Sequence, residues 1–147
     1  MTTGTSTEID VVTRFIDALE RFDIDDALAL LAPEVTYQNV PFPPARGHDA
    51  VAEQLRGLVR YLSAFEVRMH HIAANGTVVL TERTDVLGVG PVRAAFWVCG
   101  TFEVHDGRIT VWRDRVALHQ LAPLAVHAIK FGGGYVGAVR QALDRYR

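Results

Sequence analysis

Two aspartates and one arginine in this sequence have types and positions that suit a buried acid–base site. Arg83 and Asp85 lie two apart in residues 81–87, where the pattern predicts a half-buried strand, so both side chains leave the same face. Asp114 lies on the apolar face of a second strand-like run, residues 109–114. If both faces line one cavity, two carboxylates share one guanidinium there. Because burying charge is costly, such a trio is usually closely paired or used for chemistry.

This arrangement would supply both partners of an acid–base reaction. Two carboxyl groups beside one guanidinium can hold a single proton unequally, so that one is an acid and the other a base, and the pair titrates as a unit. Tyr37 and Asn39 share one face of a short strand-like run, and their oxygens can hold a water molecule while a carboxylate removes its proton. The sequence has no Gly-x-Ser-x-Gly motif, so we expect water, and not a covalent nucleophile, to attack.

Each of these residues also has an explanation that involves no chemistry. Arg83 and Asp85 could form an exposed cross-strand ion pair, and such pairs are common and weak. Asp114 could simply end its strand. Tyr37 and Asn39 are found more often in cores and turns than around a bound water. Burial of the trio in one place is therefore the observation that separates the two explanations.

The other reactive side chains predict no further site. His70 and His71 are neighbours in a predicted strand, so they should point to opposite faces and cannot bind one metal ion together. Lys130 is the only lysine, and its position in the tail speaks against a Schiff-base mechanism. Cys99 is the only cysteine, which excludes an internal disulfide and a cysteine-based metal site and favours a cytoplasmic protein.

The composition is typical of a soluble globular domain, with 49% apolar and 22% charged residues. A length of 147 residues predicts one domain over residues 1–147. The net charge of -2 and the pI near 6.3 give no basic surface for nucleic acid or anionic lipid. Residues 1–7 lack the pattern of a signal peptide, and no apolar run approaches the roughly 18 residues of a membrane span.

Three helices are predicted in the first part of the chain. Apolar residues at three- and four-residue spacing indicate an amphipathic helix near the N-terminus, with Thr5 as its capping residue. Asp23 is the expected cap of a second, short helix that runs through Leu31 and stops before Pro33. A third helix is predicted over residues 49–62, which carry apolar residues on one helical face.

The later part of the chain alternates with the period of strands. Strands are expected over residues 35–40, 65–73, 77–87, 92–105 and 108–118. Asn75-Gly76 and Asp106-Gly107 are hairpin signals, so the last four strands should form an antiparallel meander. The order of elements predicts an α+β cone: a strongly curved mixed or antiparallel sheet, three N-terminal helices on its concave face and a pocket between them. A C-terminal helix is predicted over residues 135–146.

Three groups of residues together resemble the limonene-1,2-epoxide hydrolase family. The groups are Tyr37-Gln38-Asn39 with the proline-rich residues 41–44, then Glu82-Arg83-Thr84-Asp85-Val86-Leu87, and then residues 107–114 with Trp112-Arg113-Asp114. The resemblance runs from about the first helix to Asp114. It implies an NTF2-like (SnoaL-like) cone, a homodimer, no cofactor, and the opening of an epoxide by water in one step.

The same resemblance implies a role for each polar residue. Asp114 would be the base that activates water, and Tyr37 and Asn39 would hold that water. Asp85 would be the acid that protonates the departing epoxide oxygen, and Arg83 would bridge the two carboxylates. An apolar substrate pocket is implied, lined by Ile16, Leu19, Leu58, Leu62, Leu87, Phe96, Val98 and Val116.

The sequence therefore predicts a cofactor-independent epoxide hydrolase that converts an apolar epoxide to a vicinal diol. After Asp114 the chain has Arg115-Val116-Ala117 where many family members have Tyr-Phe-Asp, which leaves the substrate open. A ketosteroid-isomerase-like or polyketide-cyclase-like enzyme would share the cone, but Arg83 beside Asp85 favours an ionised carboxylate over a neutral donor for an enolate. A non-catalytic binding module is the third possibility, and a trio scattered over the outer surface would favour it.

Overall fold

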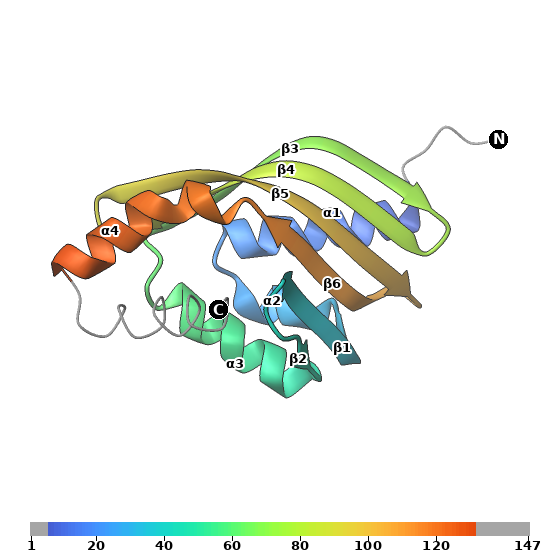
Figure 1. The fold of residues 1–147 in the computed structure, drawn as a ribbon. Helices are drawn as coiled ribbons and strands as arrows, with labels where there is room; N and C mark the ends of the chain where they lie inside the picture. Colours follow the sequence, from blue (N-terminus) through green and yellow to red (C-terminus); the bar gives the residue numbers. More distant parts are fainter. Residues whose placement is uncertain (1–5, 132–147) are drawn as a thin grey trace.

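The computed structural model describes residues 6–131, with side chains up to His127, as a curved sheet wrapped around helices (Figure 1). The sheet has six strands in the order β2-β1-β6-β5-β4-β3. The strands are β1 Leu31–Val40, β2 Ala45–Arg46, β3 Ala64–Asn75, β4 Val78–Val89, β5 Val92–His105 and β6 Arg108–Val116. The helices before β3 are α1 Thr7–Glu20, α2 Ile24–Ala29 and α3 His48–Val59. This is the arrangement of the predicted α+β cone, with α1 inside the curve of the sheet (Figure 1).

The last four strands form the predicted antiparallel meander. Two of its turns need positive φ angles, which are 61° at Gly76 and 51° and 76° at Asp106 and Gly107. Glycine adopts this region without strain and aspartate tolerates it, which is why these pairs predicted hairpins correctly. β1 pairs in parallel with β6, so two segments far apart in the sequence meet in the middle of the sheet.

The beginning of β1 differs from the prediction. α2 ends before Leu31, and Leu31 already belongs to the strand because it pairs with Ile109 of β6. The ladder then shifts register and resumes at Thr36, opposite Val111. Pro33 lies inside this shift, where its missing backbone N–H costs no ladder hydrogen bond. Proline therefore marks an irregular part of a strand here, and not the end of a helix.

Side-chain caps mark the starts of α1 and α2. Ser6 accepts a hydrogen bond from the backbone N–H of Ile9 at 3.1 Å, so Ser6, and not Thr5, caps α1. Thr5 lies outside the described residues. Asp23 caps α2 as predicted, because its carboxylate accepts from the N–H of Asp26 at 3.1 Å. The third helix is shorter than predicted and ends at Val59.

A β-bulge in β3 corrects the placement of the two adjacent histidines. The register shifts between Met69 and His71, which inserts His70 as an extra residue. His70 contacts the hydroxyl of Thr84 at 2.7 Å, and His71 lies 3.8 Å from the carboxylate of Glu82. Thr84 and Glu82 share the outer face of β4, so both histidines lie on that face and not on opposite faces. Within residues 6–131, no group of three or more His, Cys, Asp or Glu side chains is placed to hold a metal ion.

The chain continues after β6 into a 3₁₀ turn, η1 (Leu118–Leu121), and a helix, α4 (Ala122–Phe131), that packs against β5. The sequence did not predict α4. The helix predicted over residues 135–146 lies outside the described residues. Among the described residues, no helix is long and apolar enough to cross a membrane.

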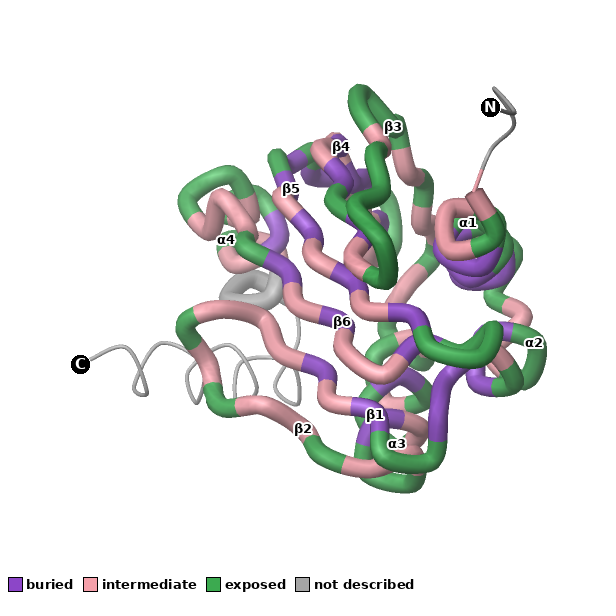
Figure 2. Tube along the Cα trace, turned by 90° about the vertical axis from the view of Figure 1, so that its right-hand side faces the viewer, coloured by how far each residue is buried: buried purple, intermediate pink, exposed green. Residues whose placement is uncertain are grey.

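The core lies between α1 and the concave face of the sheet. Val12, Phe15 and Ile16 of α1 are at most 5% exposed and pack against residues of the sheet. Buried residues alternate with more exposed residues along β5 and β6, as Figure 2 shows. The edge strand β3 is mostly exposed or intermediate. The concave side of the three central strands β4, β5 and β6 is therefore where polar side chains can be held away from water.

Candidate active site

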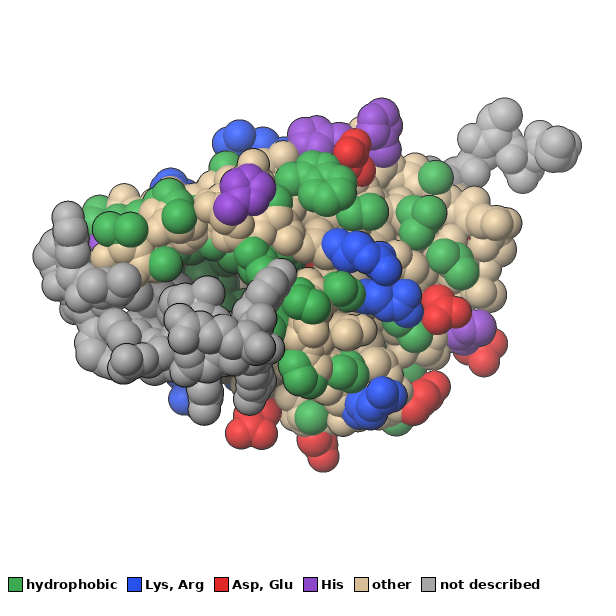
Figure 3. All heavy atoms as spheres, in the orientation of Figure 1, with side chains coloured by type: hydrophobic (Ala, Val, Ile, Leu, Met, Phe, Trp, Pro, Cys, Tyr) green, Lys and Arg blue, Asp and Glu red, His purple; other side chains and the backbone are tan. Residues whose placement is uncertain are grey.

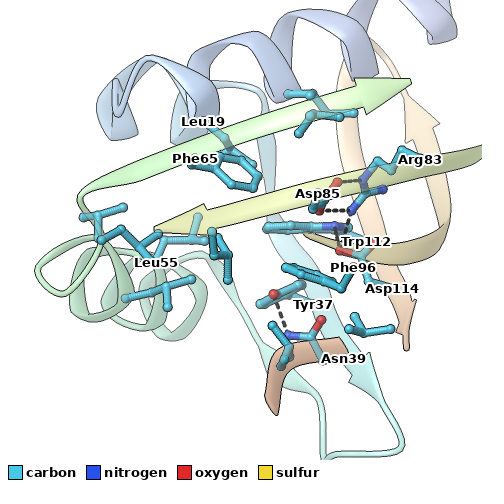
Figure 4. A pocket seen from close by; sticks show the side chains of 18 of the residues that line it. Leu19, Tyr37, Asn39, Leu55, Phe65, Arg83, Asp85, Phe96, Trp112 and Asp114 are labelled. Atoms are coloured by element: carbon cyan, nitrogen blue, oxygen red, sulfur yellow. Dashed lines mark hydrogen bonds and ion pairs between the residues drawn. The ribbon is translucent and has the colours of Figure 1, made fainter. Parts of the chain in front are cut away.

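Arg83 and Asp85 from β4 meet Asp114 from β6 on the concave side of the sheet (Figure 4). Arg83 Nε donates to Asp85 Oδ1 at 2.9 Å, and Nη2 donates to Asp85 Oδ2 at 3.3 Å and to Asp114 Oδ2 at 2.9 Å. The three residues are only 3–5% exposed. One guanidinium therefore bridges two buried carboxylates, and the explanation as an exposed ion pair is wrong.

β5 lies between the two strands of the trio and leaves room for it. Gly100 of β5 is paired with Thr81 on one side and Asp114 on the other. A Cβ atom at Gly100 would lie 2.5 Å from Arg83 Nη1 and 2.8 Å from Asp114 Oδ1, so no side chain fits there without moving the trio. Thr81 Oγ1 accepts from Arg83 Nη1 at 3.0 Å, which satisfies the third nitrogen of the guanidinium.

The parallel pairing of β1 with β6 places a second pair of polar residues beside the trio. Tyr37 is opposite Trp112, and Asn39 is opposite Asp114. The amide Nδ2 of Asn39 donates to the hydroxyl oxygen of Tyr37 at 2.6 Å, and Nε1 of Trp112 donates to Asp114 Oδ2 at 3.0 Å. The Tyr37 and Trp112 rings stack with centroids 3.8 Å apart and planes 26° from parallel. Tyr37 and Asn39 thus form one row on β1, and Trp112 and Asp114 form the neighbouring row on β6. Asn39 therefore lies beside Asp114.

The two oxygens of Asp114 have different surroundings. Oδ2 accepts from both Arg83 and Trp112, whereas Oδ1 is buried and has no hydrogen-bond partner among the described residues. Buried polar atoms are normally satisfied by protein or by water. Oδ1 is therefore the oxygen of Asp114 whose acceptor positions are not used by the described residues.

One cavity of about 630 Å³ is lined by the five polar residues Tyr37, Asn39, Arg83, Asp85 and Asp114. The remaining described lining residues are apolar and come mainly from α1, α3, the strands, and the η1–α4 segment. Figure 3 shows hydrophobic side chains gathered near α4 on this face of the molecule. A cavity of this size that is apolar apart from one cluster of convergent polar groups is typical of a small-molecule site.

Burial and mutual charge set the ionisation of the cluster. Burial raises the pKa of Asp85 to about 6, against the opposing effect of Arg83. Burial also raises the pKa of Asp114, and the charge and hydrogen bonds of Arg83 and the hydrogen bond of Trp112 oppose this. Burial raises the pKa of Tyr37, which keeps its phenol protonated. Burial would lower the pKa of Arg83, but Asp114 and Asp85 outweigh it and keep the guanidinium charged. One proton shared by the two carboxyl groups would make the trio neutral.

The raised pKa of Asp85 predicts a specific pH dependence of stability. Between pH 3.8 and about pH 6, Asp85 of the folded protein keeps a proton that Asp85 of the unfolded chain has released. The free energy of unfolding therefore falls as the pH rises through this window. Relative to the Asp85→Asn variant, wild type should lose on the order of 3 kcal/mol between about pH 4 and about pH 7. Urea unfolding of both proteins at several pH values measures the difference. If the stability of wild type relative to Asp85→Asn instead increased with pH, Arg83 would lower the pKa of Asp85 more than burial raises it.

The structure brings together nearly all of the residues singled out from the sequence. Tyr37, Asn39, Arg83, Asp85 and Asp114 lie at the cavity, as do Ile16, Leu19, Leu58, Leu62, Leu87, Phe96 and Val116. Val98 is the exception, because it is fully buried and does not line the cavity. Its register partners are Arg83 and Val116 on the two neighbouring strands, so it belongs to the packed wall.

Sequence analysis missed three residues of the cluster. Trp112 lies two positions before Asp114 on the same strand face, and this spacing could have indicated a contact between them. Thr81 has the same relation to Arg83. Gly100 carries no signal in the sequence, because its importance depends on which strands flank it.

Comparisons with known proteins agree on one family. The limonene-1,2-epoxide hydrolase catalytic domain matches residues 6–124. Epoxide hydrolase EphG of Mycobacterium tuberculosis is 50% identical over 103 residues, which cover 70% of this chain and 68% of that protein. A solved structure of an M. tuberculosis LEH-like epoxide hydrolase has a TM-score of 0.75 and 42% identity, covering 86% of this chain and 98% of that chain.

A more distant structure supports the fold alone. An NTF2-like protein of unknown function from Burkholderia pseudomallei has a TM-score of 0.73 at 17% identity, covering 81% of this chain and 98% of that chain. The likeness confirms the predicted NTF2-like cone. At this identity it carries no information about chemistry.

Proposed function

Since this chain belongs to the limonene-1,2-epoxide hydrolase family and is an epoxide hydrolase, we propose that it adds water to an apolar epoxide in one step at the Arg83, Asp85 and Asp114 trio. One observation carries the proposal. Two buried carboxylates share one guanidinium at the polar end of an otherwise apolar cavity. This is a site that can give a proton and take a proton at the same time.

Asp114 is the proposed base, and its free oxygen Oδ1 is the proposed proton acceptor. A water molecule beside Asn39 and Asp114 could donate to Asp114 Oδ1 and to the amide oxygen of Asn39. The Asn39 amide nitrogen already donates to the Tyr37 oxygen, which leaves the Tyr37 O–H free to donate to that water. These contacts would turn one lone pair of the water toward the cavity, where the substrate lies.

Asp85 is the proposed acid. Its Oδ2 has the longer contact to Arg83, 3.3 Å against 2.9 Å for Oδ1, so Oδ2 is the oxygen better placed to carry a proton. In the reaction, the water oxygen bonds to one ring carbon while the bond from that carbon to the epoxide oxygen breaks. The epoxide oxygen takes the proton of Asp85 and Asp114 takes a proton from water. A later proton transfer from Asp114 to Asp85 restores the starting state.

The two alternative functions are less well supported. A ketosteroid-isomerase-like or polyketide-cyclase-like enzyme would share the cone fold alone, whereas the family match and the relative EphG both point to epoxide hydrolysis. A binding module would have no need of a buried acid–base trio, and the trio is buried and assembled. Neither alternative has a feature of the described residues in its favour.

The proposal is tested by incubating the protein with a panel of terpene, sterol and fatty-acid epoxides and measuring diol formation. A diol from at least one apolar epoxide, above the rate without protein, is the expected result. Absence of diol from every substrate, with the protein well folded by circular dichroism, would contradict the proposal.

The charges of the cavity predict a preference for neutral substrates. Arg83 is the only cation among the described lining residues, and it is already shared by Asp85 and Asp114. A substrate carboxylate inside the cavity would therefore meet no free partner and would be repelled by the trio. We expect the methyl ester of epoxidised oleic acid to have a kcat/KM at least about tenfold higher than the free acid. Equal values for acid and ester would show that the carboxylate stays outside this environment.

The oligomeric state and location are also proposals. We expect a homodimer, because the family resemblance implies one and because the outer face of the sheet exposes Leu80 and Trp97 at 51% and 41%. Sedimentation velocity should give the mass of two chains, and a single-chain mass at micromolar concentration would contradict the expectation. A cytoplasmic location is supported by the single cysteine, and cell fractionation tests it.

A further inference from the structure

Trp112 connects the two halves of the polar cluster. Its ring stacks on Tyr37 with centroids 3.8 Å apart, and its Nε1–H donates to Asp114 Oδ2 at 3.0 Å. The phenol and the carboxylate that would contact the attacking water are thus both held by one rigid side chain. In Figure 4 the indole of Trp112 lies next to the carboxylate of Asp114, in the same group of side chains as Tyr37.

The orientation of this indole is fixed on its other sides as well. Phe15 of α1 meets the ring edge to face, with centroids 4.8 Å apart and planes at 80°. Phe102 of β5 lies nearly parallel to it at 6.4 Å, with an angle of 9°. Trp112 is 5% exposed, so a rotation that turned its N–H away from Asp114 would disturb three neighbouring rings.

We propose that Trp112 is a positioning residue for the hydrolysis: it holds Oδ2 of Asp114 in place, fixes Tyr37 relative to it, and so directs Oδ1 toward water. The inference rests on the proposed function. Trp112 makes one contact for each part of this role: its N–H donates to the base Asp114, and its ring stacks on the phenol of Tyr37.

The indole N–H also compensates for an unequal contact of Arg83 with the two carboxyl groups. Arg83 donates twice to Asp85 and once to Asp114, so its hydrogen bonds alone would favour an ionised Asp85 over an ionised Asp114. The N–H of Trp112 bonds only to Asp114 and favours its ionised form. The other charged or titratable groups that act on this pair are Tyr37 from β1 and, on Asp85, Glu20 from α1. β5 presents Gly100, which has no charge.

Trp112→Phe tests the inference, because phenylalanine keeps an aromatic face for Tyr37 and removes the N–H. Without this donor, the base should take up its proton at a higher pH. We expect the acidic limb of the kcat/KM profile to move up by about one pH unit, with a roughly tenfold loss of rate on that limb. Trp97→Phe is the matched control, since Trp97 also donates its N–H to a carboxylate, Glu82, but on the outer face. Its acidic limb should not move.

A second variant covers the case in which Trp112→Phe does not fold. An analogue of tryptophan with sulfur in place of the indole N–H, introduced at residue 112, keeps the size of the ring and removes only the donor. It should give the same shift. A folded variant with an unmoved acidic limb would overturn the role of Trp112, provided that Asp114→Asn shows its expected large loss of turnover. If Asp114→Asn is itself fully active, the proposed function fails instead, so the two failures are distinguishable.

Discussion

Asp114→Asn is expected to lower turnover by roughly 10²–10⁴-fold, the usual effect of removing a general base. Asparagine has nearly the same shape as aspartate, and its oxygen can still accept from Arg83 Nη2 or Trp112 Nε1. What is lost is the ability to take a proton from water. Steady-state hydrolysis of an epoxide that wild type accepts measures the effect, together with thermal unfolding to show that the fold is kept.

Asp106→Asn is a suitable control for this variant. Asp106 lies in the exposed β5–β6 turn at a φ of 51°, a conformation that asparagine also tolerates. The same chemical change there should leave turnover at the wild-type value. Full activity of the Asp114→Asn protein would exclude Asp114 as the base, and a loss of folding in place of activity would assign it a structural role.

Arg83→Met is the second change with a large expected effect, and here the effect is on stability as well as activity. Removing one member of a buried ionic cluster leaves its partners uncompensated and typically costs about 3–5 kcal/mol. Two carboxyl groups, each about 5% exposed, would lose their shared cation. Urea unfolding near neutral pH measures the cost, and epoxide hydrolysis should fall below detection.

The pH dependence gives this variant a second readout. Without Arg83, the pKa values of Asp85 and Asp114 should rise further, since the cation that lowers them is gone. Folded-state pKa values above the unfolded values mean that stability is recovered as the pH falls. Arg115→Met is the control, because Arg115 is the exposed residue next to Asp114 on the opposite strand face. Equal and pH-independent losses in the two variants would mean that Arg83 acts by packing alone.

Local periodicity explains why the trio could be predicted from the sequence. A strand repeats every two residues, so Arg83 and Asp85 had to share a face wherever the strand was placed. The turn glycines then specified the meander that brings β6 within one strand of β4. Helical spacing placed Ile16 and Leu19 on the apolar face of the first helix, and the family resemblance, not the spacing, implied that they line the cavity, where both lie.

The features that were missed depend on long-range pairing or on irregular backbone. Trp112 faces Tyr37 only because β1 pairs in parallel with β6, and periodicity contains no information about that register. Gly100 matters only because β5 lies between the two strands of the trio. The bulge in β3 placed His70 and His71 on one face, because one extra residue reverses the alternation.

The choice of attacking group is the central claim, and a single-turnover reaction in oxygen-18 water tests it most directly. With enzyme in excess over an apolar epoxide, the mechanism predicts one labelled oxygen in the diol formed in the first turnover, because water attacks the ring itself. An unlabelled diol, with the label found afterwards in a carboxyl group of Asp85 or Asp114, would mean that a carboxylate attacks first. That result would contradict the assignment of Asp114 as a base.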